Sequence, residues 1–204
     1  MKRRKGRLDQ SFVYKKFRKE LTRRYNNEKA SAIWAEAEKR LRGYDTAEPE
    51  ADTACKSFVF PAVALYQAIE HHAPGDALMV TRAYGTQFGR RIKNIFRRIT
   101  ALPGVPALMW RNMDKLARKM SDGYGTQNMI VTSDVCSLDV VSCPICDKAR
   151  ELGAPEAAQM ICCMDKEYMT GIRGMDYRRT KSLAEGDECC DYRMKRTGKK
   201  SCGF

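Results

Sequence analysis

The chain has 204 residues, of which 43% are hydrophobic, so it can bury one substantial core but is short for two independent ones. Lys and Arg number 38 against 25 Asp and Glu, and the resulting charge of +13 favours an anionic partner without identifying it. No segment offers the roughly 18 uncharged apolar residues of a membrane span, and the basic start, Met1–Lys5, precedes polar residues instead of the apolar run of an export signal. We therefore expect a soluble, cytoplasmic protein with a single domain.

The first part of the chain has the apolar periodicity of amphipathic helices. The first pattern shifts its phase near Asn26–Asn27, so it predicts either one long helix or two helices with a joint there. Gly85 and Gly89 stand four residues apart and share one helix face, where we expect a neighbouring backbone to pack closely. The predicted helices cover residues 9–42, 57–72, 77–100 and 105–120.

Two features of this helical part are open to functional interpretation. The first helix has a basic face, which we interpret as solvated, because no aromatic or glycine-rich nucleic-acid motif accompanies it. His71 and His72 are adjacent at a helix end, where a cation is favourable. Because adjacent helical side chains point in different directions, we expect that these two histidines do not readily chelate one metal together.

After Gly123 the pattern changes to the alternation of strands, interrupted by two helices that begin at prolines. The predicted fold class is α+β: an N-terminal helical region packed on a small antiparallel sheet of the order β-β-α-α-β-β in the C-terminal part. We divide the chain into a helical region (1–122), a cysteine-rich α+β region (123–196) and a flexible tail (197–204). The predicted strands cover 127–133, 137–142, 175–183 and 188–195, and the helices between them cover 144–152 and 155–170.

Nine cysteines raise the question of disulfides. Their number is odd, the chain is long, and two pairs are adjacent, Cys162-Cys163 and Cys189-Cys190. These features are typical of reduced thiols in a cytosol. Cys143 and Cys146 have the spacing of zinc ligands, so a zinc or iron–sulfur site is one reading of the sequence. Its four ligands are Cys143, Cys146, Cys162 and Cys190.

A catalytic thiol is the second reading of the cysteines, and burial as small hydrophobic residues is the third. Cys143 directly precedes a helix that begins at Pro144, and the free amide groups of such a helix start stabilise a thiolate. On the last predicted strand, Cys190 and Tyr192 face one way. Cys189, Asp191 and Arg193 face the other way.

Together these residues resemble the L-2-amino-thiazoline-4-carboxylic acid hydrolase family. The order and spacing of several short motifs carry the resemblance, chiefly in the last third of the chain. The motifs are Ser142-Cys143-Pro144, Glu151-Leu152-Gly153-Ala154-Pro155-Glu156, Cys162-x-x-Asp165, Arg179-Thr180, Leu183-Ala184-x-Gly186-Asp187 and Cys190-Asp191-Tyr192-Arg193.

The resemblance implies a hydrolase that opens a small cyclic amidine at a carbon–nitrogen bond, in the namesake case leading to a carbamoyl-cysteine. Such chemistry needs an attacking thiolate or water, an acid for the leaving atom and a cation for the substrate carboxylate. The candidate acid–base groups are Asp165 and Asp191, and the candidate carboxylate ligands are Arg179 and Arg193. The candidate thiols are Cys143, Cys162 and Cys190.

We expect no cofactor and a small anionic substrate as the partner, with neither nucleic acid nor membrane involved and the oligomeric state open. The alternative function is a cysteine-rich metal-binding or thiol-redox module that acts with a protein partner. It is motivated by Cys143-x-x-Cys146 and the two adjacent cysteine pairs.

Overall fold

The computed structural model describes residues 6–198, which fall into two compact units. Within the described residues, the first unit contains the chain up to Phe88 together with Ile145–Ile161. The second unit contains Gly89–Pro144 and the chain from Cys162 onward. From residue 199 on, the predicted tail lies outside the described residues.

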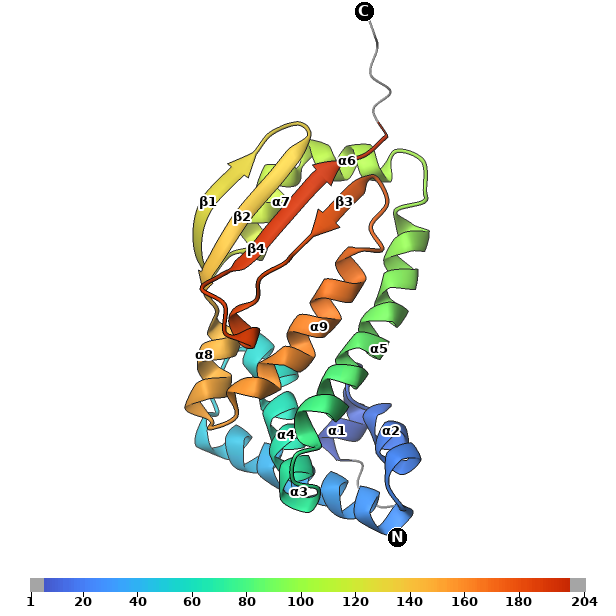
Figure 1. Cartoon of the computed structure of the whole chain (residues 1–204), viewed down its shortest axis with the longest axis vertical. Coiled ribbons are helices and arrows are strands. Elements are labelled where there is room, and N and C mark those ends of the chain that lie inside the picture. The colour runs from blue at the N-terminus through green and yellow to red at the C-terminus, as the bar shows by residue number, and fades with distance from the viewer. Residues whose placement is uncertain (1–5, 199–204) are drawn as a thin grey trace, which may run out of the picture. The chain divides into compact units, whose positions relative to one another are not determined.

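The order of elements confirms the α+β class, because helices occupy the first part of the chain and a four-stranded antiparallel sheet forms in the C-terminal part (Figure 1). Short π or 3-10 segments lie at Cys55–Val59, Pro155–Ala157 and Leu183–Glu185. The main elements are α1 Arg7–Gln10, α2 Phe17–Arg24, α3 Asn27–Ala47, α4 Phe60–His72, α5 Ala77–Ile99, α6 Val105–Arg111, α7 Met113–Met120, β1 Gly125–Val131, β2 Val135–Ser142, α8 Pro144–Glu151, α9 Ala158–Met169, β3 Met175–Arg178 and β4 Cys190–Arg196.

The first unit is built on the packing of α3 against α4. Of the two alternatives, one long helix or two helices with a joint near Asn26–Asn27, the structure has the joint: the Asn26 side chain accepts a hydrogen bond from the backbone N–H of Lys29 at 2.8 Å and caps α3. A cap of this kind satisfies one of the free amide groups at a helix start and so favours a new helix there. The fully buried side chains of this unit include Phe17, Leu21, Ile33, Leu41, Phe60, Leu65 and Ile69.

Close packing at the two glycines of α5 is also confirmed. In the first unit, a Cβ atom on Gly85 would lie 2.1 Å from the carbonyl oxygen of Met160. In the second unit, a Cβ atom on Gly89 would lie 2.6 Å from the carbonyl oxygen of Met164. Both carbonyls belong to α9, so α9 approaches α5 more closely than any residue with a side chain would allow.

Three predicted elements are wrong in their extent. The helix pattern predicted from residue 9 is interrupted between α1 and α2, where residues 11–16 are not helical. The helix predicted over 105–120 is broken at Asn112, whose side-chain amide donates to the carbonyl of Leu108 at 2.8 Å. The strand predicted over 175–183 ends at Arg178. The backbone amides of Thr180 and Lys181 instead donate to the carboxylate of Asp191, so they are not available for a strand ladder.

The sheet of the second unit has the strand order β1-β2-β4-β3, with all pairs antiparallel (Figure 1). β1 is irregular, since its register with β2 shifts between Gln127 and Ile130, and Asn128 has a φ of 52°. One face of the sheet, which we call the inner face, packs on helices of the same unit, including α7 and α9. Its buried side chains are Cys136, Leu138, Val140, Tyr177, Cys190 and Met194.

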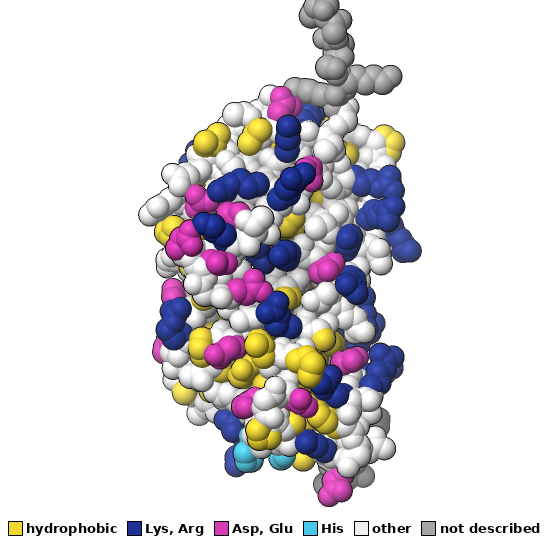
Figure 2. Space-filling model, in the orientation of Figure 1, with side chains coloured by type: hydrophobic (Ala, Val, Ile, Leu, Met, Phe, Trp, Pro, Cys, Tyr) yellow, Lys and Arg dark blue, Asp and Glu magenta, His cyan; other side chains and the backbone are white. Residues whose placement is uncertain are grey.

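The other face of the sheet, the outer face, carries polar side chains. Figure 2 shows basic and acidic side chains interspersed over it. This alternation of buried and exposed residues is the one expected for an antiparallel sheet that is covered on one side.

Among residues 6–198, no helix is long and apolar enough to span a bilayer.

Candidate functional site

A buried ion pair lies on the inner face of the sheet in the second unit. Arg179 comes directly after β3, and its side chain is only 3% exposed. Its Nη1 atom lies 3.1 Å from Oδ2 of Asp165 on α9. The Asp165 side chain is 20% exposed, so solvent reaches the carboxylate but not the guanidinium.

Two tyrosines and a main-chain carbonyl complete the surroundings of this ion pair. The hydroxyl of Tyr192 donates to Oδ2 of Asp165 at 3.1 Å and accepts from Nη1 of Arg179 at 3.1 Å. Nη2 of Arg179 donates to the carbonyl oxygen of Cys162 at 2.9 Å. Tyr168 lies close enough to Asp165 for the carboxylate to raise the pKa of its hydroxyl. The side chains of Arg179, Asp165, Tyr192 and Tyr168 are called the inner cluster below.

The electrostatics of the inner cluster keep its tyrosines protonated. Burial and the nearby carboxylate of Asp165 raise the pKa of Tyr192 and of Tyr168 well above the usual range. Burial alone would lower the pKa of Arg179, but the neighbouring Tyr192, Tyr177 and Asp165 hold it above its ordinary value. At neutral pH the cluster therefore offers a guanidinium and phenol O–H groups beside one carboxylate.

The three predicted thiols lie close to the inner cluster. Cys190 is buried on β4, and its pKa is raised by burial although the backbone N–H of Leu183 donates to its Sγ atom at 3.3 Å. Cys143 and Cys162 are near enough to Cys190 to act on that pKa. Cys162 is half-buried and also lies within the field of Arg179. Arg179 acts on Cys190 as well, so the difference between the two thiols is burial: Cys190 is buried and Cys162 is half-buried.

Two predicted site residues are not part of this cluster. Asp191 points away from it, and its carboxylate accepts hydrogen bonds from the backbone amides of Thr180 and Lys181 at 2.7 and 2.6 Å. Arg193 extends over the outer face, where Nη2 lies 2.6 Å from Oδ1 of Asp139. The alternation of β4 separates these two side chains from Cys190 and Tyr192, whereas the sequence interpretation combined both faces in one site.

Asp191 instead holds the turn that follows Arg179. Burial alone would raise its pKa, but the hydrogen bonds from Lys181 and Thr180 lower it below the ordinary value. A carboxylate whose pKa is lower in the folded state stabilises the fold above its unfolded pKa of about 3.9, and this contribution is lost as the pH falls through the folded value.

We expect the Asp191→Ala variant to be less stable than the parent at neutral pH by roughly 1–2 kcal/mol, since three hydrogen bonds to a charged group are lost. The difference should shrink in acid. Urea unfolding of both proteins from pH 7 down to pH 3 measures this, and parallel stability curves over that range would contradict the assignment.

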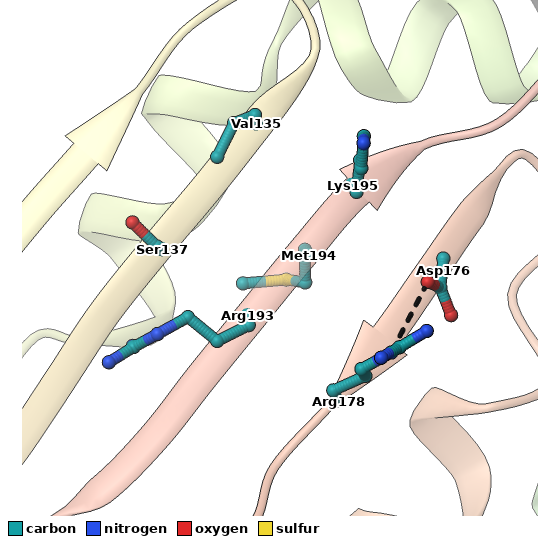
Figure 3. A pocket seen from close by; sticks show the side chains of 7 residues that line it. All are labelled: Val135, Ser137, Asp176, Arg178, Arg193, Met194 and Lys195. Carbon is teal, nitrogen blue, oxygen red and sulfur yellow. Dashed lines mark ion pairs between the residues drawn. The ribbon is translucent and has the colours of Figure 1, made fainter.

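Two hollows of the second unit, among the described residues, lie on the outer face of the sheet. One has a volume of about 380 Å³, and Figure 3 shows Arg193, Lys195 and Arg178 around it. A second, of about 290 Å³, adjoins Asp191 and Arg193. Neither hollow is lined by a residue of the inner cluster. A functional site chosen by the size of a hollow would therefore lie on the outer face, whereas one chosen by the grouping of reactive side chains lies on the inner face. We give more weight to the inner cluster, because its charges are buried and joined by hydrogen bonds.

Sequence reasoning missed two tyrosines beside the ion pair. The hydroxyl of Tyr177 is buried and, among the described residues, has no hydrogen-bond partner. Tyr168 stands three residues after Asp165, the helical spacing that also relates Cys162 to Asp165. That spacing could have identified Tyr168, whereas nothing in the sequence distinguishes Tyr177 from an ordinary core tyrosine.

The zinc or iron–sulfur site predicted at Cys143, Cys146, Cys162 and Cys190 stays a prediction. In the described part of the chain, the set of three or more potential ligand atoms that lie within 4.8 Å of one another comes from Glu36, His71 and His72. The two imidazoles were expected to point in different directions, but Nδ1 of His71 and Nε2 of His72 both approach Oε2 of Glu36.

Comparison with known families identifies the relationship of the chain. The profile of the L-2-amino-thiazoline-4-carboxylic acid hydrolase family matches residues 7–194. The chain therefore belongs to this family, and the relationship extends well beyond the last third in which the motifs lie. Comparison with curated proteins gives no match.

Proposed function

We propose that the chain hydrolyses a small cyclic amidine that carries a carboxylate, such as an amino-thiazoline carboxylate, and opens its ring at a carbon–nitrogen bond. The observation that carries the proposal is the buried guanidinium of Arg179, which joins Asp165, Tyr192 and the main chain of Cys162 in one hydrogen-bonded group. A base, a proton donor and a cation are the three groups that the reaction requires.

The proposed reaction is the addition of water to the amidine carbon, followed by ring opening. Asp165, which solvent reaches, takes a proton from the attacking water. The hydroxyl of Tyr192, which is hydrogen-bonded to Asp165, supplies a proton to the departing ring nitrogen in this scheme. Collapse of the tetrahedral intermediate then leaves a free amine and a carbamoyl group on sulfur. The oxygen of the water becomes the carbonyl oxygen of the product.

Binding of the substrate carboxylate is assigned to Arg179, whose guanidinium is closed to solvent while it is paired with Asp165, so the substrate must open part of that pairing. Arg193, the other candidate, is paired with Asp139 on the outer face and does not reach the inner cluster. The buried hydroxyl of Tyr177 supplies a further hydrogen bond to the substrate in this proposal, since a buried polar group without a partner is costly unless a ligand satisfies it.

Cys162 is the alternative attacking group. Its thiol lies near Arg179, and a thiolate could add to the amidine carbon in place of water. Replacement of Cys162 by Ser separates the two routes. Direct attack by water leaves most of the turnover in the Cys162→Ser variant, whereas attack by the thiolate does not.

The proposal is tested by incubating the purified protein with 2-amino-thiazoline-4-carboxylate and following the products by mass spectrometry. We expect a product heavier by one water and the appearance of a primary amine. We expect the Tyr192→Phe variant to lose turnover by about 10²-fold, because the proton donor is absent while the ring is kept. The control is Tyr66→Phe, which removes the hydroxyl of a half-buried tyrosine on α4.

Several outcomes would contradict the proposal. A free thiol in place of the amine would move the cleavage to the carbon–sulfur bond. Equal turnover in the Tyr192→Phe and Tyr66→Phe variants would remove Tyr192 from the reaction. No turnover of this compound or of related cyclic amidines by the folded protein would reject the function as a whole.

A further inference from the structure

Two adjacent histidines at the end of α4 converge on one carboxylate of α3 in the first unit. Nδ1 of His71 lies 2.7 Å from Oε2 of Glu36, and Nε2 of His72 lies 2.8 Å from the same oxygen. The two imidazole centroids are 4.8 Å apart. The three possible ligand atoms thus lie within the space that one ion would occupy.

Glu36 is held in the orientation that this convergence needs. Nε and Nη2 of Arg40 donate to its other oxygen, Oε1, at 2.8 and 2.6 Å. Arg40 is itself fixed by Gln67, which accepts from its Nη1 atom at 3.1 Å. Proteins usually orient a metal-binding side chain through hydrogen bonds to its other polar atom, the one that does not bind the metal. Oε2 is therefore presented to the two imidazoles.

The charge distribution around Oε2 favours a cation. His71 and His72 are the last two residues of α4, where the free carbonyl groups form the negative end of the helix dipole. The positive charge of Arg40 opposes a metal ion, so we expect weaker binding than at a structural zinc site.

The geometry needs little change to hold an ion. Zinc binds histidine nitrogen and carboxylate oxygen at about 2.0–2.2 Å, which in a tetrahedral site places ligand atoms about 3.3 Å from each other. The observed separations from Oε2 are 2.7 and 2.8 Å, so a modest widening suffices. The His71 side chain is 64% exposed and free to make that adjustment, and Figure 2 shows the histidines at the surface.

From this arrangement we propose that Glu36, His71 and His72 bind one divalent transition-metal ion, with zinc as the probe and solvent water completing the coordination. Two imidazoles and one carboxylate suit zinc and its neighbours in the first transition series, and they do not suit magnesium or calcium, which prefer oxygen ligands. The site is independent of the inner cluster, since all its ligands belong to the first unit.

The test is a calorimetric titration of the metal-free protein with Zn²⁺, without substrate. We expect one zinc ion per chain at this site, and a loss of affinity of at least about 10–100-fold in each of the Glu36→Gln, His71→Ala and His72→Ala variants, because each removes a direct ligand. The matched control is Glu28→Gln, the same substitution at an exposed position of α3, which should bind as the parent does. Circular dichroism confirms that each variant is folded.

The cysteines could bind zinc as well, so a second measurement identifies the ligands. Co²⁺ bound by imidazole and carboxylate gives only weak visible bands, whereas thiolate ligands add intense near-ultraviolet absorption. We expect the weak bands, and we expect them to disappear in the His72→Ala variant. Thiolate absorption with unchanged binding in the three variants would overturn the proposal, as would the absence of zinc binding by the folded parent. Neither result bears on the hydrolase proposal, which is tested by turnover.

Discussion

The Asp165→Asn variant is expected to lose turnover by about 10²–10⁴-fold and to lose about 3–5 kcal/mol of its free energy of unfolding. Turnover falls because an amide cannot accept the proton of the attacking water. Stability falls because the guanidinium of Arg179, whose side chain is 3% exposed, would keep its charge without the carboxylate that lies 3.1 Å away. Steady-state kinetics and urea unfolding measure the two effects separately.

A second substitution separates the loss of stability from the loss of turnover. In the Asp165→Asn/Arg179→Met double variant the unpaired buried charge is gone, so we expect most of the stability to return, while turnover stays absent because the proposed base and the proposed cation are both missing. Asp176→Asn is the matched control, since Asp176 lies on the exposed side of β3 and pairs with Arg178 at 3.5 Å in solvent. Its stability should change by less than about 0.5 kcal/mol. Full activity in the double variant would show that Asp165 serves the fold alone.

The Gly85→Ala variant is expected to be destabilised by about 1–3 kcal/mol, although alanine favours a helix by about 1 kcal/mol over glycine. The new Cβ atom would lie 2.1 Å from the carbonyl oxygen of Met160, and a backbone atom cannot rotate away as a flexible side chain does. The helices of the first unit must therefore separate or lose their packing. Thermal and urea unfolding measure the loss.

The control for this prediction is Gly43→Ala. Gly43 is an exposed residue inside α3, and a Cβ atom there would meet nothing within 4 Å. We expect this variant to be more stable than the parent by up to about 1 kcal/mol, from helix propensity alone. The two alanine variants should therefore differ in sign. If Gly85→Ala is also stabilising, α5 and α9 are not in the close contact described for them.

Much of the fold follows from local patterns in the sequence. The start of α3 is predictable because Asn26 can cap it, and the close approach at Gly85 is predictable because two glycines share a helix face. The end of β3 is not predictable in this way. It depends on Asp191, which is distant in sequence and accepts hydrogen bonds from the backbone amides of Thr180 and Lys181.

The same distinction, between local sequence patterns and contacts distant in sequence, applies to the candidate site. Alternation on β4 predicts that Asp191 and Cys190 face opposite ways, and the structure places them so. The partner of Arg179, in contrast, depends on how α9 packs on the sheet, and periodicity carries no information about that. The convergence of His71 and His72 likewise requires Glu36 from another helix, so it cannot be predicted from the sequence of the helix that holds the histidines.

The irregularity of β1 has a consequence for how copies of the chain behave toward each other. β1 lies at one edge of the sheet, where a straight strand would present a row of free amide and carbonyl groups to any other extended chain. The register shift between Gln127 and Ile130, with the left-handed backbone of Asn128, interrupts that row. The Asn128 side chain is also tied to Asp139 at 2.8 Å. The bulge thus protects the open edge of the sheet against the addition of a strand from a second molecule and against aggregation at high concentration.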